Sequence, residues 1–170
     1  MLVFTFVDTI LGKGTLVSSN QGLCYFSFYH DLTGVKRWLS AHFPKNNGLT
    51  MAPDFPCLVD ATRQLNEYLA GQRHDFTFPL DLKGTGFQIG AWQALLGVPY
   101  GATTTYSELA MAIGRPRAAR AIGNAMRANP VPVFVPCHRV LPANNSLGGY
   151  GGGQELKRWL LQLEGVSVKC

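Results

Sequence analysis

The hydrophobic pattern of this 170-residue chain changes its period at the segment Lys83-Gly84-Thr85-Gly86. Upstream, apolar and β-branched residues form short strand-like runs separated by glycines, which is typical of hairpins. Downstream, apolar residues recur three and four positions apart, which is typical of amphipathic helices. Because a chain of this length holds one or two compact domains, we predict an α+β protein with domains at residues 1–83 and 84–170.

The first half is predicted to form a small antiparallel sheet with helices. The strand-like runs are LVFTFV, TLVSS, LCYFSFY and DFTFPLDL. Pro79 restricts the last run to a sheet edge, because proline has no N–H to donate to a neighbouring strand. We expect one helix around residues 35–42 and another over residues 61–70, which stops at Gly71. Nothing in this half indicates catalysis, so we expect a supporting domain.

The second half is predicted to be mainly helical and to contain a helix-turn-helix. Its first helix, in FQIGAWQALLGV, has four large apolar residues that can share a buried side: Phe87, Trp92, Leu95 and Leu96. In the next helix, Thr105 and Glu108 have the spacing of a capping box. A turn at Gly114-Arg115 follows, and Pro116 suits the first position of a second helix.

The second helix, in RPRAARAIGNAMRAN, has two different faces. Its predicted buried stripe consists of Ala118, Ala121, Ile122 and Ala125. The opposite stripe, a candidate DNA-binding face, consists of Arg117, Arg120, Asn124 and Arg127. Ala119 and Gly123 are small enough for the helix backbone to approach a groove closely. The alternative interpretation is a solvated face of the helix.

Charge is distributed unevenly along the chain, whose formal net charge is +5. Residues 1–83 contain seven basic and seven acidic residues, whereas residues 84–170 contain eight basic and three acidic ones. The stretch 109–154 holds five arginines and no carboxylate. This asymmetry favours a polyanionic partner for the second half, although a solvated basic surface is the plainer alternative.

The chain is expected to be intracellular and to have no membrane contact. Its apolar opening segment, MLVFTFVDTILGKG, contains Asp8, lacks a basic leader and is too short to span a bilayer. Four cysteines at wide spacing, Cys24, Cys57, Cys137 and Cys170, do not resemble a secreted disulfide framework. Because Cys24, His30, Cys57 and His74 show no recognised ligand spacing, we expect no metal site.

The segment VPVFVPCHRVL joins a thiol, an imidazole and a guanidinium at the end of a strand-like run. A lone buried cysteine is usually a small apolar residue, but a neighbouring histidine or positive charge favours the nucleophilic thiolate. Adjacent residues of a strand face opposite ways, so Cys137 and His138 can cooperate only where the chain leaves strand geometry. Glu164, in the last turn of the helix QELKRWLLQLEG, is either an exposed carboxylate or the group that orients the imidazole.

Three segments together, PCHRV, RAARAIGNAMRANPVP and GGYGGGQELKRWLLQLEG, resemble the O6-alkylguanine-DNA alkyltransferase family, also called methylated-DNA–protein-cysteine methyltransferases. The similarity runs from about Gly84 to Gly165, and the first half is similar only in outline. The resemblance implies a ribonuclease H-like first domain and a winged-helix-like second domain.

The resemblance also implies roles for individual residues. Cys137 would accept the alkyl group, His138 would generate the thiolate through a water, and Glu164 would orient the imidazole. Arg120 would enter the base stack, and Tyr106 would rotate the target phosphate and help to neutralise the leaving guanine. Further roles, in bracing the active-site turn and lining the substrate pocket, would belong to Asn129, Val140, Tyr150, Gly151 and Gly152. Many relatives carry serine where this chain has Gly151, so a side-chain contact to the alkylated oxygen would be lost.

The implied function is DNA repair by stoichiometric transfer of an alkyl group from O6-alkylguanine, with base flipping and no cofactor. O4-alkylthymine is a second possible substrate. The partner would be double-stranded DNA bound by a monomer, in the cytoplasm of a prokaryote or the nucleus of a eukaryote. Two other classes stay open: a Cys-His hydrolase or acyltransferase, which would turn over, and a DNA-damage sensor, against which the presence of Cys137 weighs.

Overall fold

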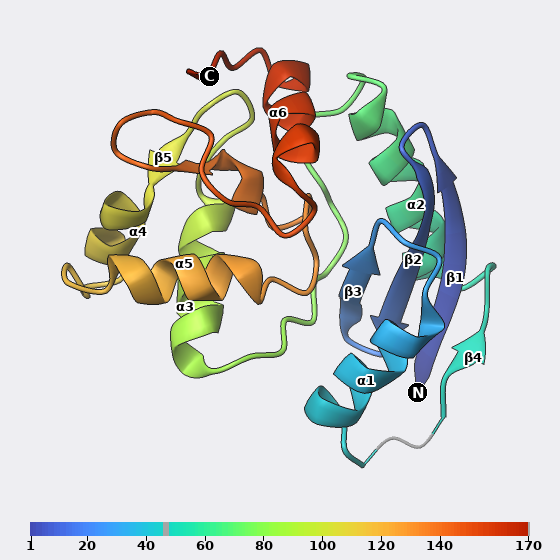
Figure 1. Cartoon of the computed structure of the whole chain (residues 1–170). Helices are drawn as coiled ribbons and strands as arrows, with labels where there is room; N and C mark the ends of the chain where they lie inside the picture. The colour runs from blue at the N-terminus through green and yellow to red at the C-terminus, as the bar shows by residue number, and fades with distance from the viewer. Residues whose placement is uncertain (46–47, 170) are drawn as a thin grey trace. The chain divides into compact units, whose positions relative to one another are not determined.

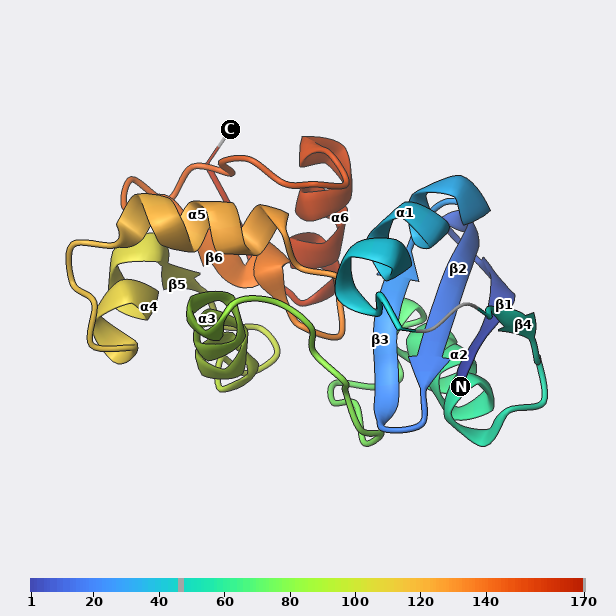
Figure 2. The ribbon, with the colours of Figure 1, turned by 90° about the horizontal axis from the view of Figure 1, so that it is seen from below.

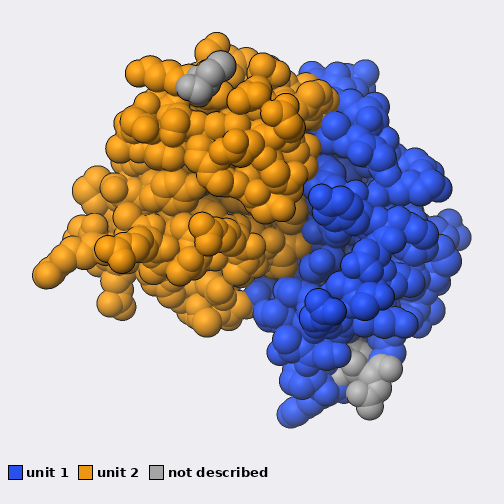
Figure 3. Space-filling model, in the orientation of Figure 1, with its two compact units in different colours: residues 1–83 blue, residues 84–170 orange. Residues whose placement is uncertain are grey.

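The computed structural model describes residues 1–45 and 48–169. It divides into two compact units, Met1–Lys83 and Gly84–Cys170, which are coloured separately in Figure 3. Unit 1 is built on a small sheet with helices and unit 2 is mainly helical, which confirms the predicted α+β class. Cys170, one of the four cysteines considered above, lies outside the described residues.

The sheet of unit 1 has the strand order β3-β2-β1-β4. Its strands are β1 (Leu2–Thr9), β2 (Gly12–Ser19), β3 (Gly22–Ser27) and β4 (Thr50–Met51). The first three are antiparallel neighbours in a meander, as predicted. The two-residue β4 pairs in parallel with β1, so the predicted antiparallel sheet has one short parallel strand at its edge.

Two helices cover the sheet of unit 1 (Figures 1 and 2). Helix α1 (Leu32–His42) starts where the Asp31 carboxylate accepts hydrogen bonds from two backbone N–H groups, and it packs Val35 and Leu39 against Leu2 and Phe4 of β1. Helix α2 (Pro56–Leu69) contacts β1, β2 and β3. It begins five residues before the predicted start at Ala61, because Pro56 occupies the first turn, where no N–H is needed.

The predicted edge strand DFTFPLDL is not formed. Only Leu80 makes a bridge, in parallel, with Leu23. The Gln64 side chain of α2 binds Thr77 near the start of this segment: its oxygen accepts from the Thr77 N–H and its amide donates to the Thr77 hydroxyl, both at 2.9 Å. Further along, the backbone of Leu23 donates to the Pro79 carbonyl at 2.9 Å and accepts from the Asp81 N–H at 2.8 Å. The segment then runs so close to β3 that a Cβ at Gly22 would lie 2.3 Å from the Pro79 carbonyl oxygen, so only glycine fits there.

Unit 2 packs three helices against one another: α3 (Gly86–Leu96), α4 (Tyr106–Ala112) and α5 (Ala119–Arg127). The predicted capping box of Thr105 and Glu108 is confirmed at the start of α4. The indole N–H of Trp92 in α3 donates to the Ala125 carbonyl of α5 at 2.9 Å. Two short parallel strands, β5 (Thr104–Thr105) and β6 (Val140–Leu141), and the final helix α6 (Gln154–Leu163) complete the unit.

Three details of the predicted helices were wrong. Helix α5 begins at Ala119, so Pro116 and Arg117 lie in the preceding turn, which the hydrogen bond from the Ala118 N–H to the Arg115 carbonyl closes. Ala121 is exposed, and the buried stripe consists of Ile122, Ala125 and Met126, because α3 and α4 cover that side. Leu96, at the end of α3, is 44% exposed.

The described residues contain no helix with the length and apolar character needed to cross a bilayer. Within the same residues, no three side chains of His, Cys, Asp or Glu lie close enough together to hold a metal ion.

Candidate active site

The apolar run that precedes the cysteine is a buried turn, so the strand-like interpretation was wrong. Its only ladder contact is a bridge between Pro132 and Val135. The Val135 N–H donates to the Val131 carbonyl at 3.0 Å, and Val133 has a φ of 75°. A β-branched residue rarely adopts this left-handed conformation, so the surrounding structure must hold the turn in place.

Asn129 ties this turn together with its side-chain amide. Its Nδ2 donates to the Val135 carbonyl at 2.9 Å and to the Cys137 sulfur at 3.1 Å, and its Oδ1 accepts from the Val131 N–H at 3.0 Å. The chain then forms a 3₁₀ turn over Cys137–Arg139. The required departure from strand geometry is therefore present at the Cys-His pair.

The thiol of Cys137 is buried, and burial raises its pKa above the ordinary value because a thiolate is poorly solvated there. The Asn129 hydrogen bond and the positive charge of Lys157 oppose that effect, as does a hydrogen bond with Tyr150. The expectation that neighbouring groups lower the pKa is thus met only in part. Desolvation is the larger effect, so the resting cysteine is a thiol that must lose its proton before it reacts.

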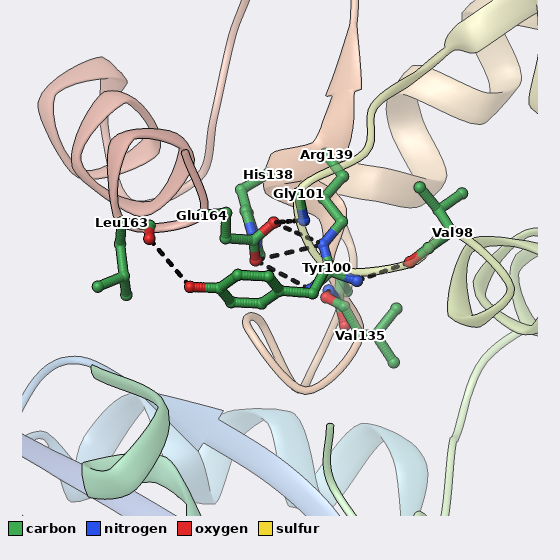
Figure 4. A network of polar contacts seen from close by, with 9 residues as sticks. Val98, Tyr100, Gly101, Val135, His138, Arg139, Leu163 and Glu164 are labelled. Atoms are coloured by element: carbon green, nitrogen blue, oxygen red, sulfur yellow. Dashed lines mark hydrogen bonds and ion pairs between the residues drawn. The ribbon is translucent and has the colours of Figure 1, made fainter. Parts of the chain in front are cut away.

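His138 is fully buried and lies against the carboxylate of Glu164, with 2.8 Å between His138 Nε2 and Glu164 Oε1. Figure 4 shows Glu164 between His138 and Arg139. Burial lowers the pKa of His138, while the Glu164 carboxylate opposes that effect and the Arg139 charge adds to it. The imidazole is therefore neutral near pH 7 and able to accept a proton.

Glu164 has two further partners besides His138. Arg139 donates to both of its oxygens, with Nη2 at 2.9 Å from Oε1 and Nε at 3.0 Å from Oε2. The backbone N–H of Gly101 also donates to Oε2, at 3.2 Å. Arg139 is held in turn by the Val98 carbonyl, at 2.6 Å from Nη1. This network keeps the buried carboxylate ionised and fixed in position (Figure 4).

Cys137 opens onto a cavity of about 540 Å³ between α4, α5 and the glycine-rich loop of residues 148–153. The cavity is lined by Thr105, Tyr106, Ser107, Ala119, Arg120, Gly123, Asn124, Met126, Arg127, Cys137, Ala143, Gly149, Tyr150 and Gly151. Most of the site residues predicted from the sequence are thus brought together around one hollow.

Six predicted site residues are not part of the cavity lining: His138, Glu164 and Asn129, which are described above, and Arg117, Val140 and Gly152. Arg117 is exposed in the turn before α5. Val140 is buried in β6, where its carbonyl accepts a hydrogen bond from the Lys157 ammonium at 2.7 Å. Gly152 faces Leu156, whose Cδ2 atom would lie 2.6 Å from a Cβ at this position, so a larger residue would displace that side chain.

Tyr106 stands at the start of α4 and faces the thiol across the cavity. Its pKa is raised by burial and by the Cys137 charge, so its hydroxyl stays protonated and can donate. A Cβ at Gly123 would lie 3.9 Å from the Tyr106 ring. This is an ordinary van der Waals distance, so alanine would also fit at this position.

Sequence reasoning missed Arg139 as a partner of Glu164, Met126 as part of the cavity wall, and Lys157 altogether. Lys157 is 0% exposed. Its position three and four residues before Leu160 and Leu161, both buried in α6, places it on the apolar side of the helix. That helical spacing was the available signal.

Comparison with known proteins covers both units. Residues 86–166 match the model described as 6-O-methylguanine DNA methyltransferase, DNA binding domain, and residues 2–82 match the ribonuclease-like domain of the same family. A methylated-DNA–protein-cysteine methyltransferase of Mycobacterium tuberculosis is 52% identical over 164 residues, which is 96% of this chain and 93% of the relative. The constitutive enzyme of that name from Bacillus subtilis is 49% identical over 115 residues, 67% of this chain and 70% of its own.

Solved structures agree with this assignment. The crystal structure of Mycobacterium tuberculosis OGT in complex with DNA superposes with a TM-score of 0.81 at 39% identity, covering 95% of this chain and 92% of the other. The O6-methylguanine-DNA methyltransferase of the archaeon Pyrococcus kodakaraensis gives a TM-score of 0.70 at 30% identity, covering 98% and 100%. With both domains matched in sequence and in structure, this chain belongs to the 6-O-methylguanine DNA methyltransferase family.

Proposed function

We propose that this protein repairs double-stranded DNA by transferring the alkyl group of O6-alkylguanine to its own Cys137, once per molecule. The observation that carries the proposal is the position of Cys137 at the wall of a cavity edged by arginines, next in the chain to a buried histidine bound to an ionised carboxylate. Family membership supports the same reaction, because the relatives are named as methylated-DNA–protein-cysteine methyltransferases.

The DNA contacts are assigned to α5 and its surroundings. Arg120, Asn124 and Arg127 line the cavity, and all three are exposed. Since guanidinium groups bind phosphates and base edges, this face suits a DNA groove. A lesion inside the base stack is out of reach of the thiol, so the base must flip out. We assign Arg120 to the space that the flipped guanine vacates, and Arg117 to outer phosphate contacts.

The chemistry balances without a cofactor. His138, oriented by Glu164, receives the thiol proton, through a water in the mechanism that the family resemblance implies. The sulfur then attacks the alkyl carbon, a carbon–sulfur bond forms, and the carbon–oxygen bond breaks with its electron pair left on guanine. A proton from the Tyr106 hydroxyl neutralises the guanine anion, and the imidazolium proton restores the tyrosine. The net change moves one proton from Cys137 to guanine.

The remaining pocket residues are assigned to recognition of the flipped base. The Val140 carbonyl accepts from the guanine amine, and the Gly151 N–H donates to the alkylated oxygen. Asn129 holds the turn that carries Cys137, while Tyr150 and Gly152 shape the loop. Because the product thioether has no carbonyl for water to attack, the protein is spent after one transfer. Residues 1–83 act as a supporting domain of a monomer.

The test is the intact mass of the protein after incubation with excess duplex DNA containing O6-methylguanine, followed by peptide mapping. We expect a gain of one methyl group, on Cys137 only, that stops at one per molecule. The half-buried Cys57 of unit 1 supplies the control, because C57S should be methylated as the wild type is.

Other outcomes would favour the other classes. Tight lesion binding with no gain of mass would indicate a damage sensor. Catalytic turnover on thioesters, with no gain of mass and no DNA binding, would indicate a hydrolase.

A further inference from the structure

The Lys157 side chain is buried among apolar residues of unit 2 although it carries an ammonium group. It is 0% exposed, and its helix neighbours Leu160 and Leu161 are equally buried. No carboxylate in residues 1–45 and 48–169 forms an ion pair with it. Burial of an unpaired charge is costly, so a lysine here calls for a specific interaction.

The Lys157 ammonium bridges two parts of the proposed active site. It donates to the Val140 carbonyl at 2.7 Å and to the Gly149 carbonyl at 3.3 Å. Val140 follows the 3₁₀ turn that carries Cys137, and Gly149 belongs to the loop that lines the cavity. One side chain of α6 therefore connects the nucleophile's turn to the loop that lines the cavity.

The carbonyl that Lys157 binds is also the one assigned to the guanine amine. A carbonyl oxygen has two lone pairs, so Val140 can accept from Lys157 and from a guanine together. The ammonium fixes where that oxygen points.

Electrostatic coupling links Lys157 to the cysteine. Burial lowers the pKa of Lys157 to about 8, and the Cys137 charge opposes this. At pH 7 the group is still an ammonium, and its charge in turn lowers the pKa of the Cys137 thiol and of His138. The groups coupled to the thiol are thus Lys157 from α6, Asn129 two residues after the end of α5, Tyr150 from the loop and Tyr106 from the start of α4.

We propose that Lys157 is a positioning residue of the active site: its ammonium holds the Val140 carbonyl and the Gly149 loop in place and favours the thiolate of Cys137. The part that concerns guanine rests on the function proposed above. The part that concerns the thiol does not, because it is measured without DNA.

The test compares K157M, which keeps the length of the stem and removes the charge, with K157Q, which also keeps an N–H donor, and with K157R, which keeps the charge. The control is R158M, at the next position of α6, where Arg158 pairs with Glu155 on the surface. Thermal unfolding identifies the variants that fold. The rate of Cys137 alkylation by iodoacetamide is followed against pH by peptide mass, and methyl transfer is followed from duplex O6-methylguanine.

In K157M we expect the midpoint of the iodoacetamide profile to move to higher pH, with alkylation near neutral pH about tenfold slower. Methyl transfer should fall by at least as much. K157Q should show the same shift of the midpoint, while K157R and R158M should keep the wild-type midpoint. If K157M does not fold, K157Q takes its place.

An unchanged midpoint in a folded, uncharged variant would overturn the proposal, as would an equal shift in K157R. A wild-type protein that reacts with iodoacetamide as expected but takes no methyl group from DNA would instead refute the proposed function.

Discussion

The two units of this protein place their charges differently. In unit 1, ion pairs lie on the surface of α2 and next to it, at distances from 2.6 to 3.0 Å. They join Arg63 to Asp60 and Glu67, and Arg73 to Glu67. In unit 2, Glu164 pairs with Arg139 and His138 in the interior. Surface pairs cost little to form and contribute little to stability, whereas a buried ion is costly unless every partner is in place.

A second difference concerns the arginines. Two of the three arginines of unit 1, Arg63 and Arg73, are bound to carboxylates, whereas Arg37 is exposed and forms no ion pair with the residues that the structure describes. On and beside α5 of unit 2, three arginines, Arg117, Arg120 and Arg127, have no carboxylate within ion-pair distance among the described residues. The arginines on and beside α5 are therefore available to a polyanion, whereas the Glu164 network is fixed inside the site. Together with the cavity at Cys137, these groups are the reason why we assign the function to unit 2.

The strongest test of the contrast is C137S. We expect complete loss of methyl transfer, because a serine hydroxyl is a far poorer nucleophile than a thiolate. Binding to DNA should persist, since the arginines are untouched. A mobility-shift titration and the intact mass measure the two properties. If binding disappears together with transfer, the residue supports the fold and the separation of roles fails.

The next largest effect is expected for E164Q, which removes the charge that balances Arg139 and orients His138. Loss of one partner of a buried pair costs about 3–5 kcal/mol of unfolding free energy. The matched control is E67Q, whose carboxylate lies in the surface network of unit 1 and should cost only a small fraction of that. Urea unfolding measures the unfolding free energy of both variants. Equal losses in E164Q and E67Q would show that the buried network contributes no more to stability than the surface network does.

R120A tests the unpaired arginines. Base flipping costs a few kcal/mol, so loss of the inserted side chain should slow transfer from duplex DNA by about tenfold to a hundredfold. Transfer from free O6-benzylguanine, which needs no flipping, should change much less. R63A, at a paired arginine of unit 1, is the control and should alter neither rate. Equal losses on both substrates would refute the role of Arg120.

The smallest effect is the dependence of stability on acidity. Burial lowers the pKa of His138, so the folded protein keeps this imidazole neutral while the unfolded chain is protonated below about pH 6.5. Its contribution to stability is therefore full above about pH 6.5 and is lost as the pH falls below that value. Unfolding free energies should show this slope in the wild type and in H30Q, at an exposed control position. In H138Q the slope should be reduced, and an unchanged slope would contradict the assignment.

Much of the fold was predictable because it depends on local patterns. The glycine-bounded runs that became β1, β2 and β3, the capping box at Thr105 and the change of period at Gly84 all follow from the spacing of neighbouring residues. The failures have non-local causes. The predicted edge strand is reduced to one bridge at Leu80, while the Gln64 side chain binds Thr77. The exposed Ala121 reflects which side of α5 the other helices cover.

The sequence by itself determined the family and the candidate nucleophile, because the PCHR motif and the arginine-bearing helix are contiguous and specific. It also offered Glu164, in the last turn of the predicted helix QELKRWLLQLEG, as one candidate to orient the imidazole. Only the tertiary structure decided that this carboxylate is shared by His138 and Arg139, that burial keeps the resting thiol protonated, and that Lys157 lies inside the site. These properties depend on solvent exclusion and on distances between residues far apart in the chain, and both arise only when the helices and loops pack together.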